Sequence, residues 1–277
     1  MKGKQVVITG PTSGLGKEMA MQLGVLGADL VLACRDVERG KQTANEIAQR
    51  SGAKHIDVMH MDASSQASIR KFASQYREKY SRLDILINNA GMNRGMHPRE
   101  KSVDGIELTF ATNVLGYFLL TQELLDLLKA SAPARIVNVA SQFASDLDLD
   151  DLQFERRPFE SAKAYAQSKA CDRLFTWALA RRLKGTQVTS NAMAPGLIAE
   201  TGLFRHSPPE LVAGLRKRSA RTIVQGADTA VWLASSPEVD SVSGRFFYDR
   251  KKIPCEFRNT KAEEKLWKIC ESLIEAV

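Results

Sequence analysis

Tyr165 and Lys169 are the two side chains whose types and spacing point most directly to chemistry. They stand four residues apart in the run YAQSK, inside a strongly helical pattern. Residues four apart lie on one face of a helix, so the phenol and the ammonium can meet over one ligand. A tyrosine with a pKa of about 10 is a poor base at neutral pH. A unit charge about 4 Å away is worth roughly 4 kcal/mol at an effective dielectric of about 20, or about three pKa units. The pair therefore predicts an acid–base centre in which Lys169 lowers the pKa of Tyr165.

A glycine-rich loop, TGPTSGLGK (residues 9–17), lies between an apolar run and a helical pattern. A strand that turns through glycines into a helix presents free backbone N–H groups and the positive end of the helix dipole, which favour an anion. The P-loop pattern fails because five residues separate Gly10 from Gly16 and Glu18 stands where a magnesium-binding hydroxyl is needed. The loop therefore disfavours an ATPase or GTPase. In a dinucleotide loop, Gly10 would make the tight turn, Gly14 would admit a pyrophosphate and Gly16 would allow helix packing.

Short β-rich runs alternate with helical patterns along the chain, in the manner of a parallel sheet covered by helices. With 277 residues and no internal repeat or linker, the chain suits one large domain. We therefore expect a single α/β domain over residues 1–277, a doubly wound (Rossmann) fold whose parallel seven-stranded sheet has helices on both faces. Strands are expected at 5–9, 29–33, 55–60, 84–88, 135–140, 187–192 and 245–248, and helices near 15–26, 37–50, 65–80, 104–129, 161–183 and 225–235.

Composition restricts the partners and the compartment. Hydrophobic residues at 44% and charged residues at 26% are ordinary for a soluble globular protein. The net charge of +7 comes from 39 basic residues spread over predicted helix faces among 32 acidic ones, so a solvated surface is preferred to a nucleic-acid site. No apolar run approaches about 20 residues and the first strand begins near Met1, so we expect a cytoplasmic protein with no membrane span or signal peptide. The four cysteines lack metal-ligand spacing, which predicts neither a metal site nor a disulfide framework.

Arg35, in the run VLACRD at the end of the second predicted strand, bears on the choice of dinucleotide. About 20 residues past the glycine loop, a dinucleotide fold usually places an acidic residue that accepts from the ribose hydroxyls of NAD. A guanidinium cannot accept those hydrogen bonds, but it can donate two to a 2′-phosphate. We therefore expect NADP(H), with a contact worth about 1.5–3 kcal/mol. Two alternatives stay open: Arg35 pairs only with Asp36 or solvent, or Asp36 serves NAD after a small backbone shift.

The glycine spacing T-G-x-x-x-G-x-G resembles that of the short-chain dehydrogenase/reductases, and further motifs of that superfamily follow in its usual order. These are MDAS (61–64), NNAG (88–91), TNVLG (112–116), VNVAS (137–141) and YAQSK (165–169). The resemblance covers nearly the whole chain and implies the strand order 3-2-1-4-5-6-7. It also implies a catalytic set of Asn113, Ser141, Tyr165 and Lys169. In this set Ser141 would fix the substrate oxygen, Asn113 would position a water-linked proton relay, and Lys169 would also hold the nicotinamide ribose. The oxidised nicotinamide would then act with Lys169 in lowering the pKa of Tyr165.

The same resemblance implies which residues bind the cofactor. Asp62 would face the adenine amino group, although an aspartate in this place is as well suited to cap a helix. Asn89 would tie the edge of the sheet together, and Thr201 is a candidate phosphate contact. The full expected set is Gly10, Thr12, Ser13, Gly14, Leu15, Gly16, Arg35, Asp62, Ala63, Asn89, Ala90, Gly91, Tyr165, Lys169, Pro195, Gly196 and Thr201.

Residues 142–164 form a longer connection between Ser141 and Tyr165 than the commonest family members have. With ACRD before it and RKKIPCEF after it, this segment resembles the retinol dehydrogenase and protochlorophyllide reductase branch. Its role is open between a wall of the substrate pocket and a surface or oligomer contact. The T-G-L-F run is similar to protochlorophyllide reductase, but Leu197 stands where that family carries a reactive cysteine. Reduction of a C=C bond therefore remains only an alternative.

The residues expected to line the substrate pocket are apolar: Phe143, Leu197, Ile198, Leu203 and Phe204. Such a lining favours a hydrophobic aldehyde or ketone, retinoid- or steroid-like in size, and its alcohol. We place the substrate loop at about 197–222. A C-terminal helix at about 260–276 has apolar residues near i, i+3, i+4, i+7 spacing and is expected to pack on the domain or a sister subunit. Homo-oligomerisation is common in the superfamily but cannot be read from this sequence.

A second function class is a binding protein that senses NADP(H) without turnover. A pure sensor needs no acid–base pair, so the complete catalytic set disfavours this alternative.

Overall fold

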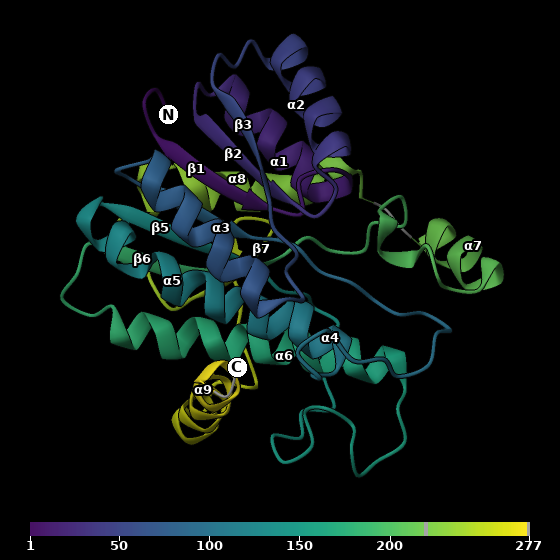
Figure 1. The fold of residues 1–277 in the computed structure, drawn as a ribbon. Helices are drawn as coiled ribbons and strands as arrows, with labels where there is room; N and C mark the ends of the chain where they lie inside the picture. Colours follow the sequence, from purple (N-terminus) through teal and green to yellow (C-terminus); the bar gives the residue numbers. More distant parts are fainter. Residues whose placement is uncertain (219–220, 276–277) are drawn as a thin grey trace.

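A central parallel sheet carries the candidate site. In the computed structural model (Figure 1), residues 1–218 and 221–275 are described, and within them the sheet has eight strands in the order β3-β2-β1-β4-β5-β6-β7-β8. The strands are β1 (Gln5–Thr9), β2 (Asp29–Cys34), β3 (Ile56–His60), β4 (Ile85–Asn88), β5 (Ala134–Val139), β6 (Val188–Ala194), β7 (Phe246–Tyr248) and β8 (Lys251–Lys252). The first seven pair in parallel in the expected order. The expected number of seven strands was one too few. The eighth strand, β8, consists of two exposed lysines that pair antiparallel with β7, and it has no apolar pattern that would have predicted it.

Helices cover both faces of the sheet, as expected for a doubly wound fold. On one face α1 (Gly14–Val25), α2 (Val37–Ser51) and α8 (Ile223–Ser235) share an apolar core with the strands. On the other face lie α3 (Gln66–Lys79), α5 (Gly116–Ala130) and α6 (Ser161–Arg182). Because both faces are covered, nearly every residue of the central strands is buried, including the polar residues Thr189, Ser190 and Asn191 of β6. The carboxyl ends of these strands meet at one edge of the sheet.

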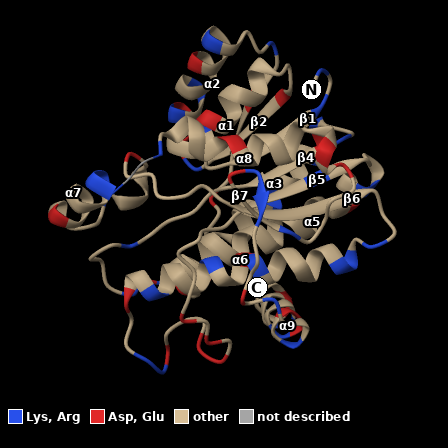
Figure 2. Cartoon of the chain, turned by 180° about the vertical axis from the view of Figure 1, so that it is seen from behind, with Lys and Arg blue, Asp and Glu red and all other residues tan. Residues whose placement is uncertain are grey.

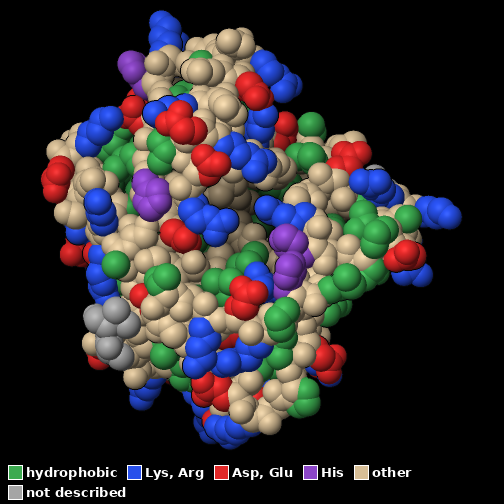
Figure 3. Space-filling model, turned by 45° about the vertical axis from the view of Figure 1, so that its right-hand side comes forward, with side chains coloured by type: hydrophobic (Ala, Val, Ile, Leu, Met, Phe, Trp, Pro, Cys, Tyr) green, Lys and Arg blue, Asp and Glu red, His purple; other side chains and the backbone are tan. Residues whose placement is uncertain are grey.

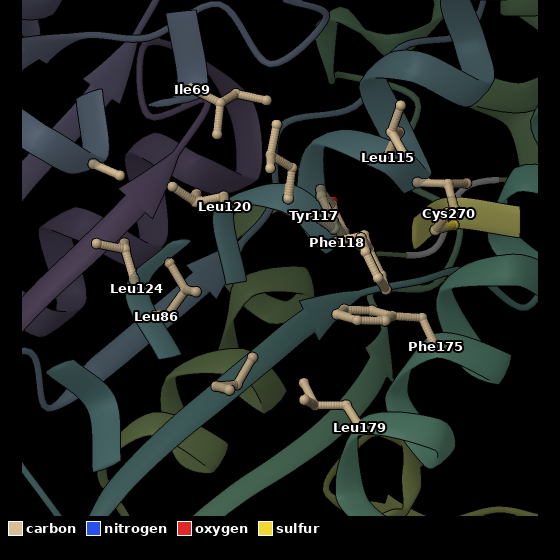
Figure 4. Close-up of a cluster of buried hydrophobic side chains, with 14 of the residues drawn as sticks. Ile69, Leu86, Leu115, Tyr117, Phe118, Leu120, Leu124, Phe175, Leu179 and Cys270 are labelled. Carbon is tan, nitrogen blue, oxygen red and sulfur yellow. The ribbon is translucent and has the colours of Figure 1, made fainter. Parts of the chain in front are cut away.

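The C-terminal helix α9 (Thr260–Glu275) packs on its own domain, outside α6 (Figure 1). Trp267 lies edge-on to Phe118 of α5, with ring centroids 4.9 Å apart, and stacks on Phe175 of α6 at 6.0 Å. Figure 4 shows Phe118 and Phe175 in the core that this helix closes. The expected helix at 260–276 is therefore present, and residue 276 lies outside the described residues.

The helix expected over 104–129 is interrupted before its main part. A short α4 (Leu108–Phe110) leads into a π-helical turn, η1 (Ala111–Leu115), and then into α5. The carboxylate of Glu107 caps this start by accepting hydrogen bonds from the backbone N–H groups of Thr109 and Phe110. A π turn is wider than an α turn and often marks a functional position. It contains Asn113.

The expected substrate loop at 197–222 contains a helix that the sequence pattern did not indicate. After a 3₁₀ turn, η2 (Gly202–Phe204), the helix α7 (Pro209–Arg218) projects from the body of the molecule (Figure 1). A second 3₁₀ turn, η3 (Pro237–Val239), follows α8. None of the α7 residues is buried, so no apolar face marks it as part of the core. Residues 219–220 of the expected loop lie outside the described residues. Figure 2 shows basic and acidic residues interspersed on α2, α7 and α9.

Candidate active site

Helix α6 places Tyr165 and Lys169 on one face, one turn apart. Both side chains are buried, and the Lys169 Nζ lies 6.0 Å from the centre of the Tyr165 ring. The ammonium donates one 2.8 Å hydrogen bond to the carbonyl oxygen of Val139, at the end of β5. It donates a second, also 2.8 Å long, to Oδ2 of Asp172. The lysine is therefore fixed between the sheet edge and its own helix.

Ser141 reaches Tyr165 from the end of β5. Its hydroxyl forms a hydrogen bond with the phenol and accepts a 3.0 Å bond from the backbone N–H of Phe143. The Phe143 ring is stacked beside the Tyr165 ring, with centroids 6.4 Å apart and planes 19° from parallel. The carbonyl oxygen of Ser141 accepts from the guanidinium of Arg173 on α6. The serine is thus held on both its side-chain and backbone sides.

Asn113 lies in the π turn, fully buried, with its amide held at both ends. Its Nδ2 donates to the Met92 carbonyl oxygen at 3.0 Å and to Ser168 Oγ at 2.9 Å, and its Oδ1 accepts from the Met92 backbone N–H at 2.9 Å. A Cβ added to Gly91 would lie 3.5 Å from Asn113 Oδ1 and 3.8 Å from Lys169 Nζ. The structure therefore brings Asn113, Gly91 and Lys169 together at the end of β4.

The pKa of Tyr165 depends on burial and on the charges nearby. Burial raises the pKa of the phenol, and the charge of Lys169 and the hydrogen bond with Ser141 lower it by less than burial raises it. Asp172, which pairs directly with Lys169, adds a smaller contribution that also raises the pKa of Tyr165. Burial favours the neutral amine of Lys169, but Asp172 raises the pKa of this lysine above its ordinary value. In the protein chain by itself the phenol therefore stays protonated at neutral pH, and a lowered pKa of Tyr165 with the oxidised nicotinamide bound stays a prediction.

The glycine loop forms a tight cradle at the edge of the sheet. Gly10 has a φ of +65°, and a Cβ there would lie 2.9 Å from the Ala90 Cα. At Gly16 a Cβ would meet the Gly10 carbonyl oxygen at 2.2 Å, so no side chain fits. Ser13 precedes α1 in extended conformation and makes no side-chain cap. An uncapped helix start behind glycines is suited to an anion such as a pyrophosphate.

Thr201 lies over this cradle, because a Cβ added to Gly14 would be 3.6 Å from the Thr201 side chain. Thr12 is a half-buried residue of the loop itself. Leu15 turns instead toward α8, where a Cβ on Gly226 would lie 2.9 Å from its Cδ2. The expected phosphate contact and the loop are thus neighbours in space although nearly 190 residues apart in the chain.

Arg35 is exposed directly after β2, and Asp36 caps α2. The Asp36 Oδ1 accepts a 3.0 Å hydrogen bond from the backbone N–H of Arg39, so its carboxylate is engaged in the helix start. Asp62 is not a helix cap, because Ser65 caps α3. Its Oδ1 accepts from the N–H and the hydroxyl of Ser64 in a local turn. The carbonyl oxygen of the neighbouring Ala63 lies against Gly116 of α5.

The residues expected at the substrate pocket divide into two groups. Phe143 is 58% exposed beside Tyr165, and Leu197, Leu203 and Phe204 are half-buried in the segment after β6. Ile198 is different: it is 3% exposed, and a Cβ on Gly226 of α8 would lie 2.0 Å from its Cδ1. The side chain of Ile198 therefore packs against α8 and is buried, unlike the other four expected pocket residues. Before it, Pro195 leads to Gly196, whose φ of +79° turns the backbone.

Most of segment 142–164 packs against itself and α6. Phe154 is buried, and its ring lies 5.5 Å from that of Phe159. Asp151 accepts hydrogen bonds from the backbone N–H groups that follow Phe154, and Gln167 of α6 donates to the Leu152 carbonyl oxygen. Phe143 near the start of the segment lies beside the Tyr165 ring, and residues 161–164 at its end already belong to α6, which carries Tyr165. In Figure 3, the surface is hollowed between the body of the molecule and the projecting α7, with basic side chains at the rim and hydrophobic ones below.

Three side chains that the sequence analysis did not single out complete this neighbourhood: Asp172, Arg173 and Tyr117. Asp172 pairs with Lys169 at i,i+3 spacing, which is the one signal that could have shown it. Arg173 is 2% exposed and lies 4.0 Å above the Phe246 ring. The Tyr117 ring of α5 lies 5.3 Å from Lys169 Nζ. Nothing in the sequence shows that charges at 172 and 173 are buried.

Two further observations concern other kinds of site. A cavity of about 740 Å³ lies at the start of β6 and the end of α6, away from Tyr165, with Trp177, Arg245 and Arg258 in its lining. Within residues 1–218 and 221–275, no three His, Cys, Asp or Glu side chains come together as metal ligands. None of the helices in the described part of the chain combines the length and the apolar character needed to cross a membrane.

Comparison with known proteins identifies the class. Residues 4–211 match the family described as short chain dehydrogenase. The chain belongs to this family of NAD(P)(H)-using oxidoreductases and acts on CH–OH and carbonyl groups. Within the family it falls in the retinol dehydrogenase-like branch. It is 41% identical to retinol dehydrogenase 14 of Homo sapiens, over 99% of this chain and 87% of the relative. It is 39% identical to retinol dehydrogenase 13 of Homo sapiens, over 96% and 82%.

Solved structures agree with the fold. A protein from Mycobacterium Paratuberculosis superimposes with a TM-score of 0.78 at 29% identity, covering 99% of this chain and 94% of that one. The Pseudomonas aeruginosa RhlG/NADP active-site complex superimposes with a TM-score of 0.73 at 28% identity, covering 89% and 94%.

Proposed function

We propose that the protein is an NADP(H)-dependent oxidoreductase that interconverts a hydrophobic aldehyde or ketone and its alcohol, with Tyr165 as the acid and base. The observation that carries this proposal is the convergence of Lys169, Ser141 and Asn113 on the carboxyl edge of the sheet around the Tyr165 phenol. A glycine cradle opens at the same edge. A protein that only senses a dinucleotide needs the cradle but not the acid–base group.

The residues present fit a dinucleotide phosphate. The loop leaves no room for a side chain at Gly10 or Gly16, and the uncapped start of α1 would offer backbone N–H groups to the pyrophosphate. Arg35 would hold the 2′-phosphate, because it is exposed at the end of β2 while Asp36 is engaged in capping α2. Thr201 would contact a phosphate and Lys169 the nicotinamide ribose. When bound, the cofactor supplies or accepts the hydride at the substrate carbon.

Tyr165 handles the proton of the reaction. In reduction its phenol donates a proton to the carbonyl oxygen, and in oxidation its phenolate takes the alcohol proton. Ser141 fixes the substrate oxygen, since its hydroxyl already reaches the phenol. Asn113 orders a water-linked relay, and its amide is held for this by both backbone groups of Met92. Because burial keeps Tyr165 protonated at neutral pH, the chain by itself is prepared to donate.

The substrate class follows from the apolar side chains around Tyr165. Phe143 offers an exposed aromatic face, and Leu197, Leu203 and Phe204 stand on the segment that crosses the glycine cradle. The relatives at about 40% identity are named for retinol, an apolar alcohol, which supports the same class. We therefore propose that the substrate is an aldehyde or ketone of retinoid or steroid size. We also propose that the protein acts in the cytoplasm.

The test is NADPH oxidation with a panel of hydrophobic aldehydes and ketones, retinal included, run beside NADPH binding by fluorescence. Turnover that increases with the apolar character of the carbonyl compound is the expected result. NADPH binding without turnover across the panel would contradict the proposal and favour a sensor.

A further inference from the structure

The carboxylate of Asp172 holds Lys169 from the protein interior. Asp172 is fully buried and lies one turn below Lys169 on α6, with Oδ2 2.8 Å from the lysine Nζ. Its other oxygen, Oδ1, has no hydrogen-bond partner among the described residues. Burying an ionised carboxylate costs several kcal/mol unless a partner compensates it. Burial raises the pKa of Asp172 to about 6 and Lys169 opposes this rise, so the carboxylate is charged above about pH 6.

The groups that face Asp172 come from three helices. Lys169 is the cation in direct contact, and the guanidinium of Arg173 also attracts the carboxylate. The neutral titratable groups around it are Tyr165 and Cys171 of α6, Tyr117 of α5 and Cys270 of α9. Arg173 is turned away toward the Ser141 carbonyl and the Phe246 ring. Lys169 and Asp172 thus form a pair of opposite charges, with the phenol of Tyr165 above it.

This arrangement determines when the Tyr165–Lys169 pair gives up its first proton. When Asp172 is ionised and both Tyr165 and Lys169 are protonated, the negative carboxylate cancels the positive ammonium, and these three side chains together carry no net charge. Without the carboxylate, the same cluster carries one uncompensated positive charge, which burial disfavours. The cluster then loses a proton at lower pH. Because Tyr165 and Lys169 titrate together, this pKa is a property of the pair, whichever of the two groups releases the proton. Either loss removes the form in which a phenol donates beside a charged lysine.

We propose that Asp172 is a positioning residue of the reaction: it anchors the Lys169 ammonium and keeps the Tyr165–Lys169 pair fully protonated, the form that reduces a carbonyl. This inference rests on the proposed function, in which Tyr165 gives its proton to the carbonyl oxygen. Asp172 acts through Lys169 and does not touch substrate. It sets the alkaline limit of carbonyl reduction.

The kinetic test compares Asp172→Asn, which removes the charge and keeps the shape, with the wild-type enzyme. The alkaline limb of kcat/KM for reduction of a hydrophobic aldehyde should move at least one pH unit lower. Asp172→Glu should restore most of the limb. Asp84→Asn is the matched control, since Asp84 is also a buried, ion-paired carboxylate but binds Lys4 and Arg82 at the opposite edge of the sheet. The alkaline limb of kcat/KM for Asp84→Asn should lie at the same pH as in the wild type.

A second measurement needs no turnover. In protein labelled with ¹³Cζ-tyrosine and ¹⁵Nζ-lysine, the Tyr165 resonance is the one missing in Tyr165→Phe. In the wild type, both the phenol and the Lys169 ammonium should stay protonated up to about pH 10, near the ordinary tyrosine value. In Asp172→Asn, one of the two should titrate at least one unit lower.

The outcomes separate this inference from the proposed function. If no carbonyl compound is reduced but the NMR shift appears, the electrostatic role of Asp172 stands and the proposed function fails. A folded Asp172→Asn with wild-type titration of both resonances overturns the inference, whatever the activity. If Asp172→Asn does not fold, a wild-type Tyr165 or Lys169 that loses its proton below about pH 9 overturns it equally.

Discussion

The side-chain amide of Asn89 donates a 2.8 Å hydrogen bond to the carbonyl oxygen of Thr9, so the end of β4 is fastened to β1 where the glycine loop leaves the sheet. The Thr9 hydroxyl accepts in return from the backbone N–H groups of Asn89 and Ala90, both at 2.9 Å. The same Asn89 amide reaches the Gly10 carbonyl oxygen at 3.2 Å. The shape of the cradle thus depends on hydrogen bonds between two strands, and α1 must approach it closely at Gly16.

Gly16→Ala should damage the cradle. The new Cβ would lie 2.2 Å from the Gly10 carbonyl oxygen and 2.6 Å from Asn89 Nδ2, so the loop must move. We expect a loss of about 1–3 kcal/mol in the free energy of unfolding and at least a tenfold weaker Kd for NADPH. Gly214→Ala in α7 is the control, because its Cβ would meet open space. Denaturant titration and fluorescence titration measure both quantities, and an unchanged Kd in Gly16→Ala would contradict the cradle.

Arg35→Ala should weaken the binding of NADPH by about 10- to 150-fold and leave the binding of NADH nearly unchanged. The reason is that only NADPH carries the 2′-phosphate that the guanidinium would hold. Arg50→Ala, at the far end of α2, removes an exposed charge without touching this place. The measurement is the Kd of each cofactor for the wild type and both variants. Equal losses for the two cofactors in Arg35→Ala would remove the basis for NADP(H).

The sequence was sufficient for the parts of the structure that depend on local pattern. Buried parallel strands are apolar runs, and the turn through Gly10, Gly14 and Gly16 needs glycine for steric reasons, so both could be predicted from residue types. The i,i+4 relation of Tyr165 and Lys169 follows from helix geometry in the same way.

The sequence was insufficient where a residue's role depends on long-range packing. Ile198 is apolar, as a residue of a hydrophobic pocket would be, but α8 covers it. The residues near position 198 give no indication that a helix beginning 25 residues later packs on this side chain. The π turn at Asn113 replaces an ordinary helical turn, and Gly116, which directly follows it, does not by itself distinguish a π turn from an α turn. The pKa of Tyr165 is raised chiefly because the phenol itself is buried, and only the tertiary structure reveals that burial.

Trp267→Ala should destabilise the fold, because this buried side chain is the largest of those that pack α9 against the domain. The ring is 4% exposed, contacts Phe118 and Phe175, and lies 3.8 Å from the guanidinium carbon of Arg182. Removing a buried aromatic ring costs about 3–5 kcal/mol. Val103→Ala, at a side chain that is 84% exposed, should cost less than about 0.5 kcal/mol. Urea unfolding followed by tryptophan fluorescence and far-UV circular dichroism gives both values, and similar midpoints for the two variants would be inconsistent with a packed α9.

Lys169→Ala should reduce stability as well as activity. It removes the partner of the buried Asp172 carboxylate, and breaking a buried ion pair costs about 3–5 kcal/mol. Lys169→Ala combined with Asp172→Asn should regain a large part of that loss, because no charge is then left unpaired. NADPH affinity should remain low in both variants, since neither retains the proposed ribose contact. Additive losses of stability in the double variant would show that the two side chains do not interact.

Tyr165→Phe separates the chemical step from cofactor binding. The substitution removes the hydroxyl that reaches Ser141 but keeps the ring, which packs beside Phe143. Proton transfer by a positioned side chain is worth about 10²–10⁴-fold in rate, so aldehyde reduction should fall by at least about 100-fold. The Kd for NADPH should stay within about twofold, in contrast to Lys169→Ala, for which rate and affinity fall together. Steady-state reduction of a hydrophobic aldehyde and NADPH titration of each folded variant provide the comparison. A Tyr165→Phe enzyme with nearly wild-type turnover would mean that another group supplies the proton and that Tyr165 is not the acid.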